Sequence, residues 1–369
     1  MSKFLFIIQG EGRGHLTQAI SLAQILRANG HEVAVGLVGI GKGRPLPAFF
    51  TQVFPASVVT FRSPHLVFSR RGISFSKTII HHLFRFRHYL KSLRHIHAAV
   101  QSHRPDVIIN FYEVLGGMYA LIYRPSVPIV AVGHHYLFLR SDFTFPAQQG
   151  LDRWLLKINT HLTAIRAGKL LALSFYPTAG PAQGKIITVP PLLREAVKTL
   201  ETGRESYLLA YITYASMSKE IIEWHLQHPE VRLHCFWENP PYDFDDTLTF
   251  HKVDGAQFLQ MMAHCTALAT TAGFESVCEA MYLGKPVLMV PAHYEQACNA
   301  LDAQRAGAGV VADRFDLSLL LDYLLTHTSS PKNFQQWCWS ANDLFLHHLE
   351  EVASSQTSDL GLENRVDAF

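Results

Sequence analysis

The sequence predicts an α/β protein made of two doubly wound domains, each built around a parallel sheet. Short apolar runs alternate with helix-like segments along the 369 residues. The runs are almost continuously apolar, which is typical of parallel strands that helices cover on both faces. At roughly 150 residues per domain, a chain of this length is expected to form two domains.

The first half opens with a strand–helix–strand unit. Phe4–Ile8 and Val33–Val38 are the expected strands, and the helix between them, Leu16–Ala28, ends at Asn29-Gly30, a favourable helix terminus. Further apolar runs predict strands at residues 106–110, 128–132 and 186–189.

A polar stretch from Arg194 to Ser206 is the expected linker. Beyond it the alternation resumes, with predicted strands at residues 207–212, 231–237, 248–251, 267–270, 286–290 and 309–311. Residues 333–352 have helical spacing and a polar tail follows. We therefore expect an N-terminal domain at 1–195, a C-terminal domain at 196–345, and a helix end with a tail at 346–369.

Composition sets the expected partners and compartment. With 32 Lys and Arg against 30 Asp and Glu, the formal charge of +2 gives no general affinity for nucleic acid. The five cysteines form no CxxC or Cys/His ligand spacing, so a reduced, cytoplasmic setting is the default. The apolar run in Met1–Gly10 is too short for a signal peptide, and no stretch is long enough to span a membrane.

The segment Ala269–Pro286 has the composition of a strand, a turn of small residues and a helix. A turn ending in Gly273 leaves room for a ligand, and the exposed N–H groups of the following helix attract phosphate. Glu275 and Glu279 lie four residues apart on one helical face, where Glu279 is placed to accept ribose hydroxyls. The alternative is that Glu275 only complements the helix dipole and that Glu279 is a solvated surface residue.

A second polar turn, Pro291–Ala300, follows the next predicted strand and carries the adjacent pair Glu295 and Gln296. A carboxylate beside an amide supplies both the acceptors and the donors that sugar hydroxyls require. Because doubly wound folds bind ligands at the carboxyl ends of their strands, we expect the two turns to form one pocket, in a cleft that the two domains face.

This set of residues closely resembles the donor domain of GT-B glycosyltransferases, with families 1 and 28 and the peptidoglycan lipid N-acetylglucosaminyltransferase as the nearest relatives. The matching pattern is Gly273-Phe-Glu-Ser-x-x-Glu279, Gly284-Lys-Pro286, Pro291, Glu295-Gln296 and Asn299-Ala300. The resemblance implies that the helix start at Gly273, Phe274, Glu275 and Ser276 holds the donor diphosphate. It also implies that Glu279 binds the ribose, that Glu295 and Gln296 bind the donor sugar, and that the main chain near Val253 contacts the base.

The first strand ends in a glycine-rich loop, Gly10-Glu-Gly12-Arg13-Gly14-His15, which is not the GxGxxG pattern of dinucleotide folds. The loop resembles the acceptor-domain loop of the same families, which places Gly12, Arg13 and Gly14 on the acceptor side. His15 is the candidate general base, because a neutral imidazole can take a hydroxyl proton. The alternatives are a histidine that bonds only locally or, as in some relatives, one that contacts phosphate.

Three further side chains follow predicted strands of the first half. Glu113 is a second catalytic candidate that would orient His15 or bind acceptor, and a purely structural carboxylate is the alternative. His134 and His135 are expected to line the acceptor side of the cleft.

Two patterns suggest other chemistry. The segment Gly36–Lys42 matches most of a phosphate-binding loop, but Gly43 stands where Ser or Thr would hold magnesium. Asp243, Asp245 and Asp246 form an acidic cluster inside a Pro-rich loop. We expect no obligatory metal and no cofactor, with the nucleotide-sugar acting as a substrate.

The stretch from Arg62 to Arg104 is locally basic and interleaved with aromatic residues. An amphipathic cationic segment of this kind suits peripheral contact with anionic lipid or an acidic acceptor, and a solvated helix face is the alternative.

The expected reaction is an inverting transfer of a hexosyl unit from a nucleotide-diphosphate sugar, with a UDP-sugar as the expected donor, to a hydroxyl of an unknown glycan, lipid or small-molecule acceptor. Two other functions fit the same fold: a nucleotide-sugar 2-epimerase and a non-catalytic module that binds a sugar nucleotide.

Overall fold

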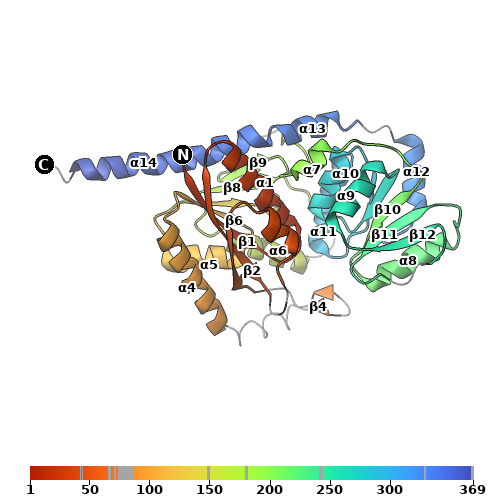
Figure 1. Cartoon of the computed structure of the whole chain (residues 1–369), viewed down its shortest axis with the longest axis horizontal. Coiled ribbons are helices and arrows are strands. Elements are labelled where there is room, and N and C mark those ends of the chain that lie inside the picture. Colours follow the sequence, from red (N-terminus) through yellow and green to blue (C-terminus); the bar gives the residue numbers. More distant parts are fainter. Residues whose placement is uncertain are drawn as a thin grey trace. The chain divides into compact units, whose positions relative to one another are not determined.

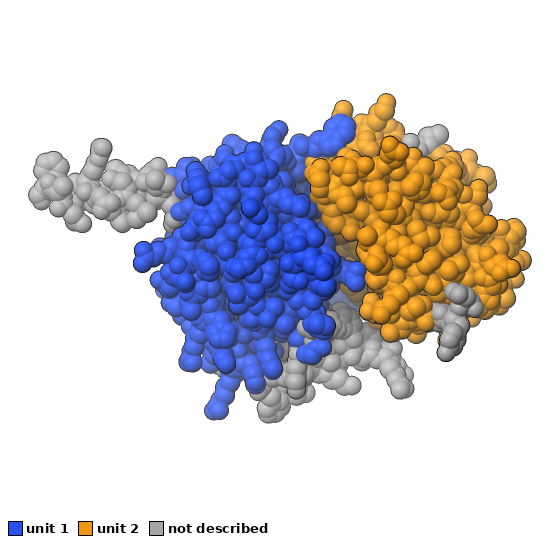
Figure 2. Space-filling view, viewed as in Figure 1, with its two compact units in different colours: residues 1–143, 151–192, 339–369 blue, residues 144–150, 193–338 orange. Residues whose placement is uncertain are grey.

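The computed structural model describes residues 1–41, 43, 45–64, 68–69, 72–73, 86–147, 150–178, 182–240, 244–327 and 330–366. The chain divides into two compact units, coloured separately in Figure 2. Unit 1 comprises Met1–Phe143, Leu151–Leu192 and Trp339–Phe369, and unit 2 comprises Thr144–Gly150 and Leu193–Cys338.

Unit 1 contains a seven-stranded sheet in the order β3-β2-β1-β6-β7-β8-β9, and every neighbouring pair is parallel. Figure 1 labels β1, β2, β6, β8 and β9 of this sheet. The strands are β1 (Lys3–Gln9), β2 (Glu32–Ile40), β3 (Ser57–Arg62), β6 (Val107–Phe111), β7 (Ile129–Val132), β8 (Lys169–Leu173) and β9 (Ile186–Val189). A separate two-stranded ribbon pairs β4 (Phe68–Ser69) with β5 (Gly72–Ile73).

The helices of unit 1 connect successive strands. They are α1 (Gly14–Ala28), α2 (Ala48–Val53), α4 (Phe86–His103), α5 (Val114–Tyr123), the 3₁₀ helix η1 (His134–Leu139) and α6 (Gly150–Thr163). The last helix, α14 (Ala341–Val366), packs against α1, β6 and β9. Its Glu350 accepts from His31 and its Glu351 pairs with Lys169, which explains why the C-terminal segment belongs with unit 1.

Unit 2 contains a six-stranded parallel sheet in the order β12-β11-β10-β13-β14-β15. Its strands are β10 (Leu208–Tyr211), β11 (Leu233–Trp237), β12 (Leu248–Lys252), β13 (Ala267–Thr270), β14 (Val287–Met289) and β15 (Gly309–Val311). Its helices are α7 (Glu195–Thr199), α8 (Ala215–His225), α9 (Gly255–His264), α10 (Phe274–Tyr282), α11 (Tyr294–Arg305), α12 (Ser318–Thr326) and α13 (Lys332–Trp339).

The predicted fold class is confirmed, because both sheets are parallel and their central strands are largely apolar and buried. Every residue of β6 and of β13 is buried, as parallel strands between two helical layers require. Four of the described strands were not among those predicted: β3 and β8 of the large sheet and β4 and β5 of the ribbon. The division between the units falls after Leu192, whereas the sequence placed it after residue 195 and assigned residues 339–345 to the second domain.

The expected linker is partly ordered as α7, and Val197 of that helix is fully buried. Among the residues that the structure describes, no helix combines the length and the apolar character needed to cross a membrane.

Candidate functional site

The turn between β13 and α10 has an unusual backbone. Ala272 is fully buried and has a φ of 61°, in the left-handed region that a side chain makes unfavourable. Asn299 of α11 donates to the Ala272 carbonyl at 3.4 Å. Gly273 then caps α10, and Ser276 donates its hydroxyl back to the Gly273 carbonyl at 3.0 Å. The turn therefore presents the first N–H groups of a nine-residue helix at the carboxyl end of β13.

The turn between β14 and α11 is bonded to the first one. Gln296 accepts from the Ala292 N–H at 2.9 Å and donates to the Thr271 hydroxyl at 3.4 Å. Asn299 also donates to Glu295 Oε1 at 2.7 Å. The structure thus brings together the two turns that the sequence placed in one pocket, on neighbouring strands of one sheet.

Glu279 forms an ion pair with Arg194. Arg194 Nη2 lies 2.6 Å from Glu279 Oε1, and Nε donates to the same oxygen at 2.7 Å. Glu279 is only 4% exposed, so the alternative of a solvated surface carboxylate is wrong. Burial raises the pKa of Glu279, and the guanidinium of Arg194 opposes that rise.

Sequence reasoning did not single out Arg194, which stands 85 positions before Glu279. No local pattern joins them, because the first residue of the linker reaches α10 only through the fold of unit 2. Arg194 Nη1 also donates to the Gly255 carbonyl at 3.5 Å. Gly255 is the first residue of α9 and lies two residues after Val253. Arg194 therefore contacts both Glu279, which we expect to bind the ribose, and the loop near Val253, which we expect to contact the base.

On unit 1, the glycine loop leads directly into α1. Gly12 has a φ of 87°, which favours glycine, and a Cβ on Gly10 would lie 2.6 Å from the Gly39 carbonyl. Arg13 precedes α1, and its carbonyl accepts from the N–H and the hydroxyl of Thr17. Gly14 begins the helix and places His15 in its first turn.

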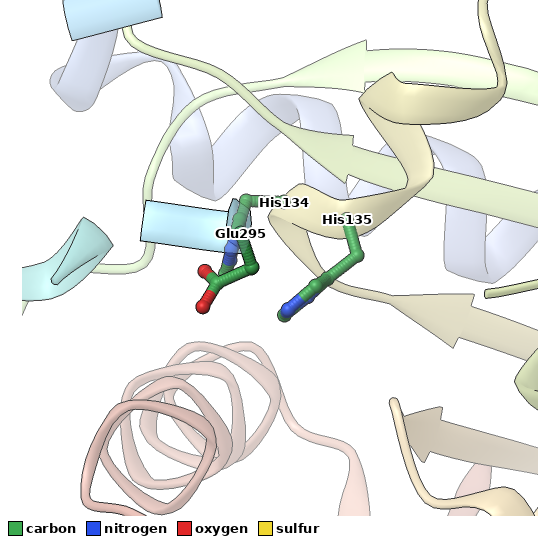
Figure 3. A group of neighbouring side chains, drawn as sticks. All are labelled: His134, His135 and Glu295. Carbon is green, nitrogen blue, oxygen red and sulfur yellow. The ribbon is translucent and has the colours of Figure 1, made fainter. Parts of the chain in front are cut away.

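His15 lies in a group of aromatic rings within unit 1. Its imidazole stacks against Tyr112 at 5.7 Å, and the rings of His135 and His134 lie 5.5 and 6.4 Å away. His134 and His135 are adjacent residues of η1 (Figure 3). Their ring centroids lie 3.7 Å apart. The structure therefore gathers the three histidines that the sequence assigned to the acceptor side.

Glu113 lies apart from that group. It is buried at the start of α5, where it accepts from the Ser63 hydroxyl at 2.5 Å and from the Leu115 N–H at 3.0 Å. Burial raises the pKa of Glu113 to about 7, and the hydrogen bonds from Ser63 and Leu115 oppose the rise. The Glu113 side chain thus caps α5, and His15 Nδ1 contacts Gln18 Oε1.

One group of potential metal ligands lies on α14, where ligand atoms of His347, His348 and Glu351 are within 4.8 Å of one another. The ammonium of Lys169 lies 2.5 Å from Glu351 and competes with a cation for this carboxylate. In the acidic cluster, Asp245 accepts from His225 and from the N–H groups of Thr247 and Leu248. Asp243 lies outside the described residues, as does Lys42 of the phosphate-loop pattern, whose residues 36–40 belong to strand β2.

Helix α4 carries the described part of the basic segment. Its exposed basic side chains include Arg87, Lys91 and Arg94, and the helix has no acidic residue. Four of the other basic residues, Arg70, Arg71, Lys77 and Arg85, lie outside the described residues.

Comparison with known proteins identifies the family. The profile of the family described as Glycosyl transferase family 1 matches residues 2–326. A 67-residue segment is 36% identical to a Caenorhabditis elegans protein provisionally named UDP-glucuronosyltransferase ugt-48, a match that spans 18% of this chain and 13% of that protein.

Solved structures share the fold over nearly the whole chain. UGT71G1 of Medicago truncatula, solved with UDP-glucose, has a TM-score of 0.66 and 13% identity, and the match covers 95% of this chain and 98% of that one. The glycotransferase of kitacinnamycin has a TM-score of 0.65 and 15% identity, with 94% and 98% covered. Because the family profile spans most of the chain, the protein belongs to glycosyl transferase family 1 and is a glycosyltransferase of the GT-B fold.

Proposed function

We propose that this glycosyltransferase moves a hexosyl unit from a UDP-sugar to a hydroxyl acceptor with inversion at the anomeric carbon. The observation that carries the proposal is the hydrogen-bonded pair of turns at the carboxyl ends of β13 and β14. Gln296 bonds Thr271 and Asn299 bonds Ala272, so a phosphate-binding helix start and a sugar-binding pair form one surface. Membership of the family favours glycosyl transfer over the 2-epimerase and the non-catalytic module.

The diphosphate would lie at the start of α10, over Gly273, Phe274, Glu275 and Ser276. The free N–H groups and the dipole of a helix start favour a diphosphate. Gly273 supports this assignment, because its φ of −63° needs no glycine and a Cβ would make only an ordinary 3.5 Å contact with Ser276. A glycine that the protein's own packing does not require leaves space for a ligand.

The ribose would bond Glu279. Both nitrogens of Arg194 bond Oε1, and among the described residues no hydrogen bond reaches Oε2. Oε2 is therefore available to accept a ribose hydroxyl, while the base would meet the main chain near Val253. Glu295 and Gln296 would bond the hydroxyls of the sugar.

In the proposed displacement, His15 takes the proton of the acceptor hydroxyl as that oxygen forms a bond to the anomeric carbon. The bond from the anomeric carbon to the diphosphate oxygen breaks in the same step, and its electron pair leaves with the nucleoside diphosphate. Positive charge at the helix start stabilises the departing diphosphate, so we propose that no metal is obligatory.

A peripheral membrane contact is a further proposal, supported by the basic exposed face of α4. Binding of the protein to vesicles of anionic and of neutral lipid, with Lys91→Glu and Arg94→Glu as variants, would measure it. Equal binding to both vesicle types would rule out a cationic contact.

A donor panel tests the main proposal. Purified protein is incubated with UDP-, TDP- and GDP-sugars and a cell extract as a source of acceptor, and the released nucleoside diphosphate is measured. We expect acceptor-dependent release from a UDP-sugar and a product of inverted anomeric configuration by NMR. Release from another nucleotide alone, or retention of configuration, would contradict the assignment, and epimerised sugar without acceptor would favour the 2-epimerase.

A further inference from the structure

His15 has a hydrogen-bond partner, Gln18, on its own helix. Gln18 stands one turn further along α1, and its Oε1 lies 3.1 Å from His15 Nδ1. Gln18 is only 1% exposed and His15 is 8% exposed, so the contact is enclosed by the protein. A buried amide costs free energy unless it is bonded, which makes this contact a determinant of local conformation.

Two polar side chains from the end of β6 and the start of α5, Asn110 and Glu113, are bonded to partners other than His15. Asn110 donates from Nδ2 to the carbonyls of Glu113 and Thr163, and its Oδ1 accepts from the Glu113 N–H. The Glu113 carboxylate accepts from Ser63 and Leu115. The contact to His15 Nδ1 is therefore made by a neutral amide and not by this carboxylate.

We propose that Gln18 is a positioning residue that sets the tautomer and the ring plane of His15. The inference rests on the proposed role of His15 as the general base. An amide oxygen facing Nδ1 requires a proton on Nδ1, which leaves the lone pair on Nε2 to receive the acceptor's proton. The rings of Tyr112 and His135 lie 5.7 and 5.5 Å from the same imidazole, and the amide fixes the rotation that these ring contacts alone leave free.

The charge of the group that contacts His15 Nδ1 also affects how stable the imidazolium form of His15 is. A carboxylate at Nδ1 stabilises the imidazolium that forms during proton transfer, whereas a neutral amide stabilises it much less. Replacing the amide with a carboxylate of the same shape should therefore change the pH range of activity, a response that a merely structural glutamine would not produce.

The experiment compares Gln18→Met and Gln18→Glu with matched changes at Gln24, an exposed glutamine of the same helix. Gln18→Met keeps the volume but removes the acceptor, and we expect kcat to fall about 10- to 100-fold with the donor KM within about twofold. Gln18→Glu should retain more of kcat than Gln18→Met and move the acidic limb of the kcat/KM profile to higher pH by about one unit. Gln24→Met and Gln24→Glu should leave both quantities unchanged.

His15→Ala separates failure of the inference from failure of the proposed function. If His15→Ala abolishes turnover while the Gln18 variants behave like the Gln24 controls, Gln18 does not position the base. A loss of kcat in both Gln18 variants with no shift in the pH profile would likewise overturn the inference, and Tm measurements would then show a loss of packing. If His15→Ala keeps its turnover, the proposed base is wrong.

Discussion

The part-exposed Arg194, at the start of the linker, forms an ion pair with the buried Glu279 in the middle of α10, with Nη2 and Oε1 2.6 Å apart. The pair holds a carboxylate in a site that would otherwise favour its neutral form, because burial raises the pKa of Glu279. The same guanidinium bonds the Gly255 carbonyl beside the loop of Val253. One arginine therefore sets the position and the charge of the group that we assign to the ribose.

Removing the charge of Glu279 should weaken donor binding. Glu279→Gln keeps the shape but loses a charge-assisted hydrogen bond, so we expect the Kd for UDP to rise at least about tenfold. Calorimetric titration with UDP measures it, with Asp322→Asn on the exposed face of α12 as the control. Unchanged affinity would remove Glu279 from the donor site.

Breaking the ion pair from the other side should destabilise unit 2. Arg194→Met leaves the buried carboxylate of Glu279 without its counter-charge. We expect the free energy of unfolding to fall by about 3 kcal/mol. This value is at the lower end for buried pairs because Arg194 is part-exposed. The double change Arg194→Met with Glu279→Gln should recover most of that loss. Denaturant titration of the four proteins in this cycle measures the coupling, and additive losses would show that the two residues act independently.

His15→Ala should lower kcat by about 10² to 10⁴, because a general base contributes about that much, and the Kd for the donor should stay within about twofold. His88→Ala, on the exposed side of α4, provides the control histidine. The reverse result, weaker donor binding with normal turnover, would assign His15 to phosphate contact.

Glu295→Gln should separate recognition of the sugar from recognition of the nucleotide. The carboxylate belongs to the pair that we propose binds the donor sugar, so the Kd for the UDP-sugar should rise about tenfold while that for UDP stays unchanged. Parallel titrations with the two ligands measure the difference. An equal loss for both would place Glu295 at the diphosphate or in the structure of the turn.

Glu113 should make the stability of the protein depend on pH. Its folded pKa of about 7 exceeds the usual value of 4.5, so the native state favours the neutral carboxyl. The neutral carboxyl therefore contributes fully to the free energy of unfolding below pH 4.5. This contribution is lost as the pH rises through 7, and the whole loss is about 3 kcal/mol. Glu113→Gln should flatten the dependence of unfolding free energy on pH between 5 and 8, whereas Glu32→Gln, a half-exposed carboxylate of the same unit, should not. An unchanged slope in Glu113→Gln would contradict the buried neutral form.

The sequence by itself determined the fold class and the donor motif. Largely apolar runs such as Val107–Phe111 and Ala267–Thr270 are typical of strands buried on both faces. The turns after β13 and β14 are short-range patterns of small and polar residues. Glu295 and Asn299 lie four residues apart on α11, a spacing that puts both on one face of the helix, and the Asn299 amide donates to Glu295 Oε1 at 2.7 Å. Such features are local, so a single sequence contains the information that specifies them.

Only the tertiary structure decided which distant side chains meet. Arg194 reaches Glu279 across 85 positions, and α14 joins unit 1 through His31 and Lys169 although the chain reaches it from unit 2. In the structure, the buried Glu113 accepts a hydrogen bond from Ser63, and His15 Nδ1 contacts Gln18 Oε1. Burial and the choice among several polar partners depend on how whole elements pack, because a buried polar group takes whichever partner the fold places within hydrogen-bond distance.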